Sequence, residues 1–147
     1  MTRARGRVLG VDLGARRIGL ALSDPGRAIA SPYSVLQRAK VRADDHRAIV
    51  AAAREAEAAT IVVGLPISLS GDLGPAARAT LAEVDELKVA AGSDVRVETY
   101  DERFTTITAE RSLNEARMKR DARRRVVDKV AAAVMLQSWL EGPGAVA

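Results

Sequence analysis

The hydrophobic pattern at the start of the chain predicts three strands. Residues 7–13 and 17–23 are mostly aliphatic, and a glycine with two arginines separates them, which is typical of a β-hairpin with a short turn. Residues 28–36 form a third extended segment. One acidic residue, Asp12, interrupts the aliphatic pattern near the end of the first strand. An ionised carboxylate there is costly unless it is hydrogen-bonded, paired or bound to a cation.

The pattern further along the chain predicts helices that alternate with strands. A charged segment that starts at Asp44 and Asp45 keeps a helical periodicity through Ala58. Residues 60–64 are wholly apolar and do not alternate, as in a strand that is buried on both faces. We expect this strand to be central in the sheet and parallel to the first strand.

The second half of the chain repeats this alternation. Glycine, serine and proline indicate a loop over residues 65–74, and Pro75 suits the first turn of the helix that follows it to Ala91. The remaining pattern predicts a strand and then two helices, at residues 95–100, 105–117 and 122–141. Together the elements predict an α/β fold with a mixed five-stranded sheet and helices on both faces. The 147 residues fit one domain over 1–147, with flexible ends at about 1–5 and 142–147.

Acidic residues follow two of the predicted parallel strands. Ligands of such sheets collect outside the carboxyl ends of the parallel strands. Asp12 lies at one such end, and Asp101 with Glu102 lies at another, so we expect these carboxylates to share one crevice.

A third carboxylate, Asp128, lies in the last predicted helix. We interpret the buried stripe of this helix as Val127, Val130, Ala131, Val134 and Ser138, extended by Met135 and Trp139. At 3.6 residues per turn Asp128 lies at the edge of this stripe, and Lys129 falls on the solvent side. Three carboxylates repel one another unless a cation offsets their charge. Two divalent ions about 4 Å apart can activate a water molecule for attack on a phosphodiester.

Composition narrows the metal chemistry. The chain has no cysteine and one histidine, His46, for which we expect no role, so a bound metal must be held by oxygen. Mg²⁺ or Mn²⁺ fits such ligands best. The apolar run after the basic N-terminus is too short for a signal sequence or a membrane span, so we expect a cytoplasmic protein without membrane contact.

Positive charge favours a polyanionic partner. The net charge is +4 and the isoelectric point is near 10.0. Basic residues crowd around position 128 and in the first turn, and we expect phosphate contacts from Arg16, Arg17, Arg103, Lys119, Arg120, Arg124 and Lys129.

Four motifs in order resemble the YqgF family, also called RuvX. They are Leu9-Gly10-Val11-Asp12-Leu13-Gly14 with Arg17-Ile18-Gly19 and Ser23-Asp24, Val62-Val63-Gly64-Leu65-Pro66 with Gly71, Asp101-Glu102-Arg103-Phe104-Thr105-Thr106, and Val127-Asp128-Lys129-Val130-Ala131-Ala132 with Leu136-Gln137. The resemblance implies an RNase H-like fold and a metal-dependent nuclease that trims the 5′ end of the pre-16S rRNA. It also implies that Asp12, Glu102 and Asp128 are the catalytic, metal-binding acids.

One departure from the related Holliday-junction resolvases leaves a choice open. Their second carboxylate comes from the fourth strand, and residues 61–66 of this chain carry none. The next strand must supply it, from either Asp101 or Glu102.

Several alternatives remain at the level of sequence. Asp12 could cap its turn, and Asp128 could pair with Lys129 or Arg124 on a helix surface. The substrate could be a four-way DNA junction, which requires a homodimer with two sites, whereas an RNA nuclease could act as a monomer. A chain of another class, a non-catalytic RNA-binding factor of ribosome assembly, would bind no divalent ion.

Overall fold

The computed structural model describes residues 6–67, 70–101 and 120–146, apart from the side chains of 120–128 and 146. The helix that the sequence predicts over 105–117 lies outside these residues. So do Glu102, Arg103 and Lys119.

Five strands form one mixed sheet in the order β3-β2-β1-β4-β5. Their bounds are β1 Arg7–Leu13, β2 Arg17–Ser23, β3 Ala30–Gln37, β4 Ala58–Leu65 and β5 Arg96–Asp101. β1, β2 and β3 pair antiparallel, whereas β1 pairs with β4, and β4 with β5, in parallel. The prediction of a mixed five-stranded sheet is therefore confirmed.

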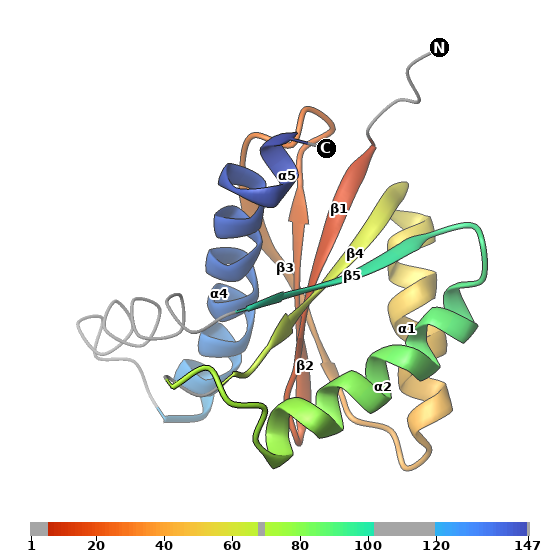
Figure 1. The fold of residues 1–147 in the computed structure, drawn as a ribbon, viewed down its shortest axis with the longest axis vertical. Helices are drawn as coiled ribbons and strands as arrows, with labels where there is room; N and C mark the ends of the chain where they lie inside the picture. Colours follow the sequence, from red (N-terminus) through yellow and green to blue (C-terminus); the bar gives the residue numbers. More distant parts are fainter. Residues whose placement is uncertain (1–5, 68–69, 102–119, 147) are drawn as a thin grey trace.

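Helices cover both faces of this sheet (Figure 1). Two of them, α1 (Arg42–Glu55) and α2 (Pro75–Ala91), lie on one face, and α4 (Arg120–Glu141) lies on the other, followed by the short α5 (Pro143–Val146). Helix α1 ends three residues before the predicted boundary at Ala58, because Ala58 already belongs to β4. Within the described ranges, no helix combines the length and apolar character that a membrane span requires.

The alternation of side chains along the central strands divides the core in two. Leu9 and Val11 of β1 pack with Ile61 and Val63 of β4 on the side of α1 and α2. Their neighbours Val8 and Val62, on the opposite face, pack against α4. Strand β4 is thus buried on both faces and parallel to β1, as predicted, although β1 is the central strand and β4 lies between it and the edge strand β5.

Helix α4 buries Met135 and Trp139, as predicted, but the rest of its buried face differs from the predicted stripe. Its fully buried residues are Ala132, Met135, Leu136, Trp139 and Leu140, which are 0–4% exposed. Val134 and Ser138 of the predicted stripe are only half-buried, and Lys129 is half-buried instead of exposed. Residues 130–136 of the helix are apolar without a break, so periodicity does not select a face there. The larger Met, Leu and Trp side chains do, because they remove more apolar area from water.

Gly10 of β1 sets how closely α4 approaches the sheet. A Cβ at this position would lie 2.9 Å from the Cβ of Leu136 and 3.3 Å from the carbonyl oxygen of Ala132. Helix α4 runs antiparallel to β1 (Figure 1), so the N-terminal half of the helix lies toward the carboxyl end of the strand.

Replacement of Gly10 by alanine should therefore push α4 away from β1. We expect Gly10→Ala to lower the free energy of unfolding by about 1–3 kcal/mol, as other overpacked cores do, measured by urea denaturation. Gly74→Ala is the matched control, because a Cβ there meets nothing within 4 Å. Because Gly74 is the N-cap of α2, where alanine is less favourable than glycine, we expect a loss below about 1 kcal/mol. Equal losses in both variants would contradict the proposed contact.

Candidate functional site

The carboxyl ends of the three parallel strands lie along one edge of the sheet. Val11 of β1 pairs with Val63, and the next residues along these strands are Asp12 and Gly64. Gly64 pairs in turn with Tyr100 of β5. Neighbouring strands are about 4.8 Å apart, so the backbones of Asp12 and Tyr100 are separated by about 10 Å, within reach of side chains from both.

Successive side chains of a strand point to opposite faces of the sheet, so the parity of a residue, its odd or even place along the strand, determines which acids face α4. Val8 and Gly10 contact α4 residues, so Asp12, which has the same parity in β1, is on the α4 face. Tyr100 of β5 also packs in the core beneath α4, and its hydroxyl lies 2.7 Å from Ser138 Oγ. Asp101, one residue later in the same strand, therefore has the opposite parity and belongs to the face that α1 and α2 cover.

A tight turn follows Asp12 directly. The amide of Gly14 donates to the carbonyl oxygens of Asp12 (3.1 Å) and Arg17 (3.0 Å). A Cβ on Gly14 would lie 2.5 Å from the Arg17 carbonyl oxygen, so only glycine fits. The prediction of a short turn after the first strand is confirmed.

The basic residues predicted to contact phosphate are described to different extents. Arg16 is exposed in the turn after Asp12, Arg17 is half-buried at the start of β2, and Lys129 is half-buried in α4. The structure gives only the helical backbone of Arg120, Arg124 and Asp128. Within the described residues no group of three or more His, Cys, Asp and Glu side chains could hold a metal. Only Asp12 of the expected acidic triad has a described side chain.

A buried ionic network adjoins the turn through Arg38 and was not predicted from the sequence. The Arg38 guanidinium donates through Nη1 and Nη2 to both carboxylate oxygens of Glu83, at 2.5 and 2.9 Å. Nη1 also contacts Asp45 (3.1 Å), and His46 Nε2 lies 2.8 Å from Glu83 Oε2. Asp45, His46 and Glu83 are only 2–6% exposed. His46, for which no role was expected, thus helps to hold a buried carboxylate.

The charges in this network compensate one another. Burial alone would raise the pKa of Glu83, but hydrogen bonds from Arg38 and His46 and their positive charge outweigh it and hold the pKa below its ordinary value. The same hydrogen bonds to Glu83 raise the pKa of Arg38. One sequence signal was available: Asp45, His46 and Glu83 share helix faces with the buried Ile49 and Leu87.

Comparison with known proteins identifies the family. The family model RuvX, described as a Holliday junction resolvase, matches residues 6–142. The chain belongs to the RuvX family. A relative from Roseiflexus sp. (strain RS-1), named "Putative pre-16S rRNA nuclease", is 40% identical over 141 residues, which cover 96% of this chain and 98% of the relative. A relative of the same name from Mycobacterium tuberculosis (strain ATCC 25177 / H37Ra) is 41% identical over 138 residues, covering 93% and 79%.

Solved structures show the same fold at low sequence identity. RuvC from Thermus thermophilus in complex with a Holliday junction substrate superposes with a TM-score of 0.53 at 16% identity, covering 92% of this chain and 94% of RuvC. A second Thermus thermophilus RuvC structure superposes with a TM-score of 0.51 at 15% identity, covering 94% of this chain and 96% of that RuvC chain. The predicted RNase H-like fold is confirmed.

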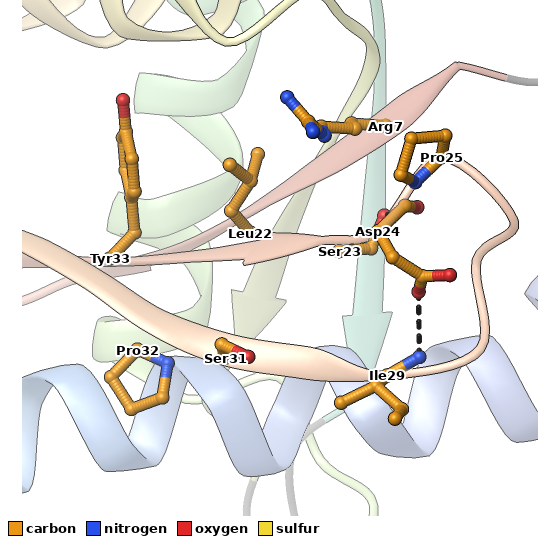
Figure 2. Close-up of a pocket in the computed structure, with 9 residues that line it drawn as sticks. All are labelled: Arg7, Leu22, Ser23, Asp24, Pro25, Ile29, Ser31, Pro32 and Tyr33. Atoms are coloured by element: carbon orange, nitrogen blue, oxygen red, sulfur yellow. Dashed lines mark hydrogen bonds between the residues drawn. The ribbon is translucent and has the colours of Figure 1, made fainter.

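Not every residue of the RuvX-like motifs lies near the carboxyl edge. Ser23 is buried at the far end of β2, where its hydroxyl accepts from the Val8 amide (2.8 Å). Asp24 accepts hydrogen bonds from the amides of Ile29 (Figure 2) and Ala28, each at 2.8 Å. These bonds lower the pKa of Asp24, and the bond from Ile29 has the largest effect. This motif therefore closes the β2–β3 connection.

The pocket drawn in Figure 2 lies at the same far end. Its volume is about 470 Å³, and its lining includes Arg7 at the start of β1 and Asp24 after the end of β2. Because β1 runs from Arg7 toward Asp12, this pocket is separate from the edge where the parallel strands end.

The lowered pKa of Glu83 predicts how stability depends on pH. Ionised Glu83 contributes stability that is fully present above the ordinary value of 4.5 and is lost as the pH falls through the lowered folded-state pKa. We expect Glu83→Gln to lower the Tm at pH 7, and the difference from the parent chain to shrink below pH 4.5. Thermal unfolding followed by circular dichroism from pH 7 to pH 3 measures this.

Glu86→Gln is the control for this pH series. Glu86 also joins α2 to α1, through an ion pair with Arg42, but both side chains are about half exposed. Its effect should be small at every pH. A Glu83→Gln deficit that stayed constant down to pH 3 would contradict the linkage.

Proposed function

We propose that this RuvX-family chain is a metal-dependent nuclease that hydrolyses phosphodiester bonds of RNA and processes the 5′ end of the pre-16S rRNA. The observation that carries the proposal is the position of Asp12. It is the penultimate residue of β1, on the α4 face, at the edge where β4 and β5 also end. Family membership and relatives named for this activity support it. Such a nuclease would act in the cytoplasm as a single domain.

Parity favours Glu102 over Asp101 as the second acid. Asp12 and Tyr100 share the α4 face, whereas Asp101 has the opposite parity. We therefore propose Glu102 as the second site carboxylate.

The packing of α4 on β1 supports Asp128 as the third acid. Gly10 lies beneath Ala132 and Leu136, and Asp12 is two strand residues further on, about 6.8 Å. At 1.5 Å per residue this distance equals four to five positions of the antiparallel helix. Position 128 is four residues before Ala132, on the same ridge as Ala132 and Leu136. The observed buried face thus brings position 128 closer to the centre of the contact than the predicted face did.

The donor set fits a hard divalent cation. The proposed ligands are three carboxylates, Asp12, Glu102 and Asp128, and the chain has no cysteine. Oxygen ligands of this kind favour Mg²⁺ or Mn²⁺. Such an ion, when bound, would lower the pKa of a bound water and offset negative charge on the phosphate. Asp12 would orient it from a rigid strand, while the half-buried setting restricts access of bulk water.

Basic residues would hold the substrate beside these acids. Arg16 is exposed in the turn that follows Asp12, and Lys129 adjoins position 128. We propose that these two bind phosphates of the RNA together with Arg17, Arg103, Lys119, Arg120 and Arg124.

A four-way DNA junction is a second candidate substrate. The description of the RuvX family model as a Holliday junction resolvase favours it. Resolution requires paired cuts by two sites, so this activity would demand a stable homodimer.

Matched acid variants test the catalytic assignment. We expect Asp12→Asn and Glu102→Gln each to lower kcat on a pre-16S rRNA 5′ fragment by more than the roughly 10- to 100-fold that loss of an outer-shell partner costs. Asp101→Asn should stay within about threefold of the parent chain, since its parity directs it to the other face. A larger loss in Asp101→Asn than in Glu102→Gln would contradict the assignment, and full activity of Asp12→Asn would overturn the mechanism.

The same variants distinguish the substrates. RNA and four-way DNA of matched length are compared in Mg²⁺ and in Mn²⁺, with sedimentation to establish the oligomeric state. Cleavage of the RNA by a monomer supports the proposal. Preferential symmetric cleavage of the junction by a dimer would favour the resolvase instead.

A further inference from the structure

Arg38 connects the buried ionic network to the turn after Asp12. Its guanidinium Nε donates to the carbonyl oxygen of Gly14 at 2.9 Å, and its backbone amide donates to the carbonyl oxygen of Arg16, also at 2.9 Å. One residue thus contacts the turn at two points. Gly14 and Arg16 lie only two and four residues after Asp12, on the loop that fixes where β1 ends.

The network holds Arg38 in one orientation. Nη1 and Nη2 engage both oxygens of Glu83, and Nη1 also reaches Asp45, so three guanidinium nitrogens bond in three directions. Such a planar fork has little rotational freedom left. Asp45 is fixed in turn, because its other oxygen accepts from the amide of Ala39 at 2.7 Å.

The partners of Arg38 in the network come from α1 and α2. Asp45 and His46 are on α1 and Glu83 is on α2, the two helices that cover the face opposite α4 (Figure 1). Among the residues that the structure describes, the hydrogen bonds from this network to the end of β1 go to the turn, at Gly14 and Arg16. A displacement of about 1 Å in a catalytic group can reduce turnover about 100-fold, so a rigid turn has catalytic value.

We propose that Arg38, clamped by Glu83, is a positioning residue that holds the Gly14 turn and thereby fixes Asp12 at the carboxyl end of β1. This proposal rests on the proposed nuclease function for its effect on turnover. Its structural part, the clamp on the turn, stands independently of that function.

The first test compares Arg38→Lys with Arg42→Lys. Lysine keeps the charge but has no fork, so it cannot bond Glu83 and the Gly14 carbonyl together. Arg42 also joins α1 to α2, through Glu86, but it is exposed and has no contact with the turn among its observed bonds. Hydrogen exchange of the Gly14 amide should accelerate at least tenfold in Arg38→Lys and less than twofold in Arg42→Lys, with the Val62 amide of β4 unchanged in both.

The second readout is the split between kcat and KM on the RNA substrate. Arg38→Lys should lower kcat at least tenfold and leave KM within twofold, because Arg38 contacts the turn and not the substrate. Ile49→Val, a core change in α1 away from the turn, is the control for lower stability alone and should leave kcat unchanged. If Arg38→Lys does not fold, Glu83→Gln is the second variant. It replaces the carboxylate that both Nη atoms of Arg38 bond, so it should reproduce the loss of kcat.

The outcomes separate this proposal from the nuclease assignment. Unchanged Gly14 exchange in both Arg38→Lys and Glu83→Gln overturns the clamp, whatever the activity. Faster exchange with parental kcat overturns the positioning of Asp12. If the parent chain has no nuclease activity, the proposed function fails, and hydrogen exchange still decides whether Arg38 holds the turn.

Discussion

The parallel pairing of β1 with β4, with helices packed on both faces, is the constraint on which the rest of this structure depends. Parallel strands end at the same edge, so β1, β4 and β5 deliver their C-terminal residues to one place. Both faces must then be covered, because residues 60–65 of β4 are buried and all but Thr60 are apolar. Helix α4 covers one face, while α1 and α2 cover the other and hold Arg38, which bonds to the turn.

Two glycines convert this arrangement into a defined site. Gly10 lets α4 approach β1 closely, which determines the α4 position that lies nearest Asp12. Gly14 lets the chain reverse immediately after the carboxylate, and Arg38 ties that reversal to the opposite layer. The chemistry of Asp12 therefore depends on packing on both sides of the sheet.

The sequence predicted the features that local pattern determines. The unbroken run in β4 correctly indicated burial on both faces, and the glycine between two aliphatic runs correctly indicated the first turn. The buried face of α4 was predicted only in part: Met135 and Trp139 were expected in it, whereas Leu136 and Leu140 were not, because residues 130–136 are all apolar and their periodicity selects no face. The network was not predicted because Glu83 is distant in sequence from Arg38 and His46, so their complementary charges meet only in the fold.

The proposed site requires the carboxylates of Asp12, Glu102 and Asp128 to converge on a divalent cation. Crystals of the full chain grown with Mn²⁺, with anomalous diffraction recorded near the manganese edge, test this most directly. We expect an anomalous peak within coordination distance of carboxylate oxygens from Asp12, Glu102 and Asp128. A peak coordinated by Asp101 instead of Glu102, or Mn²⁺ bound only away from Asp12, would contradict it.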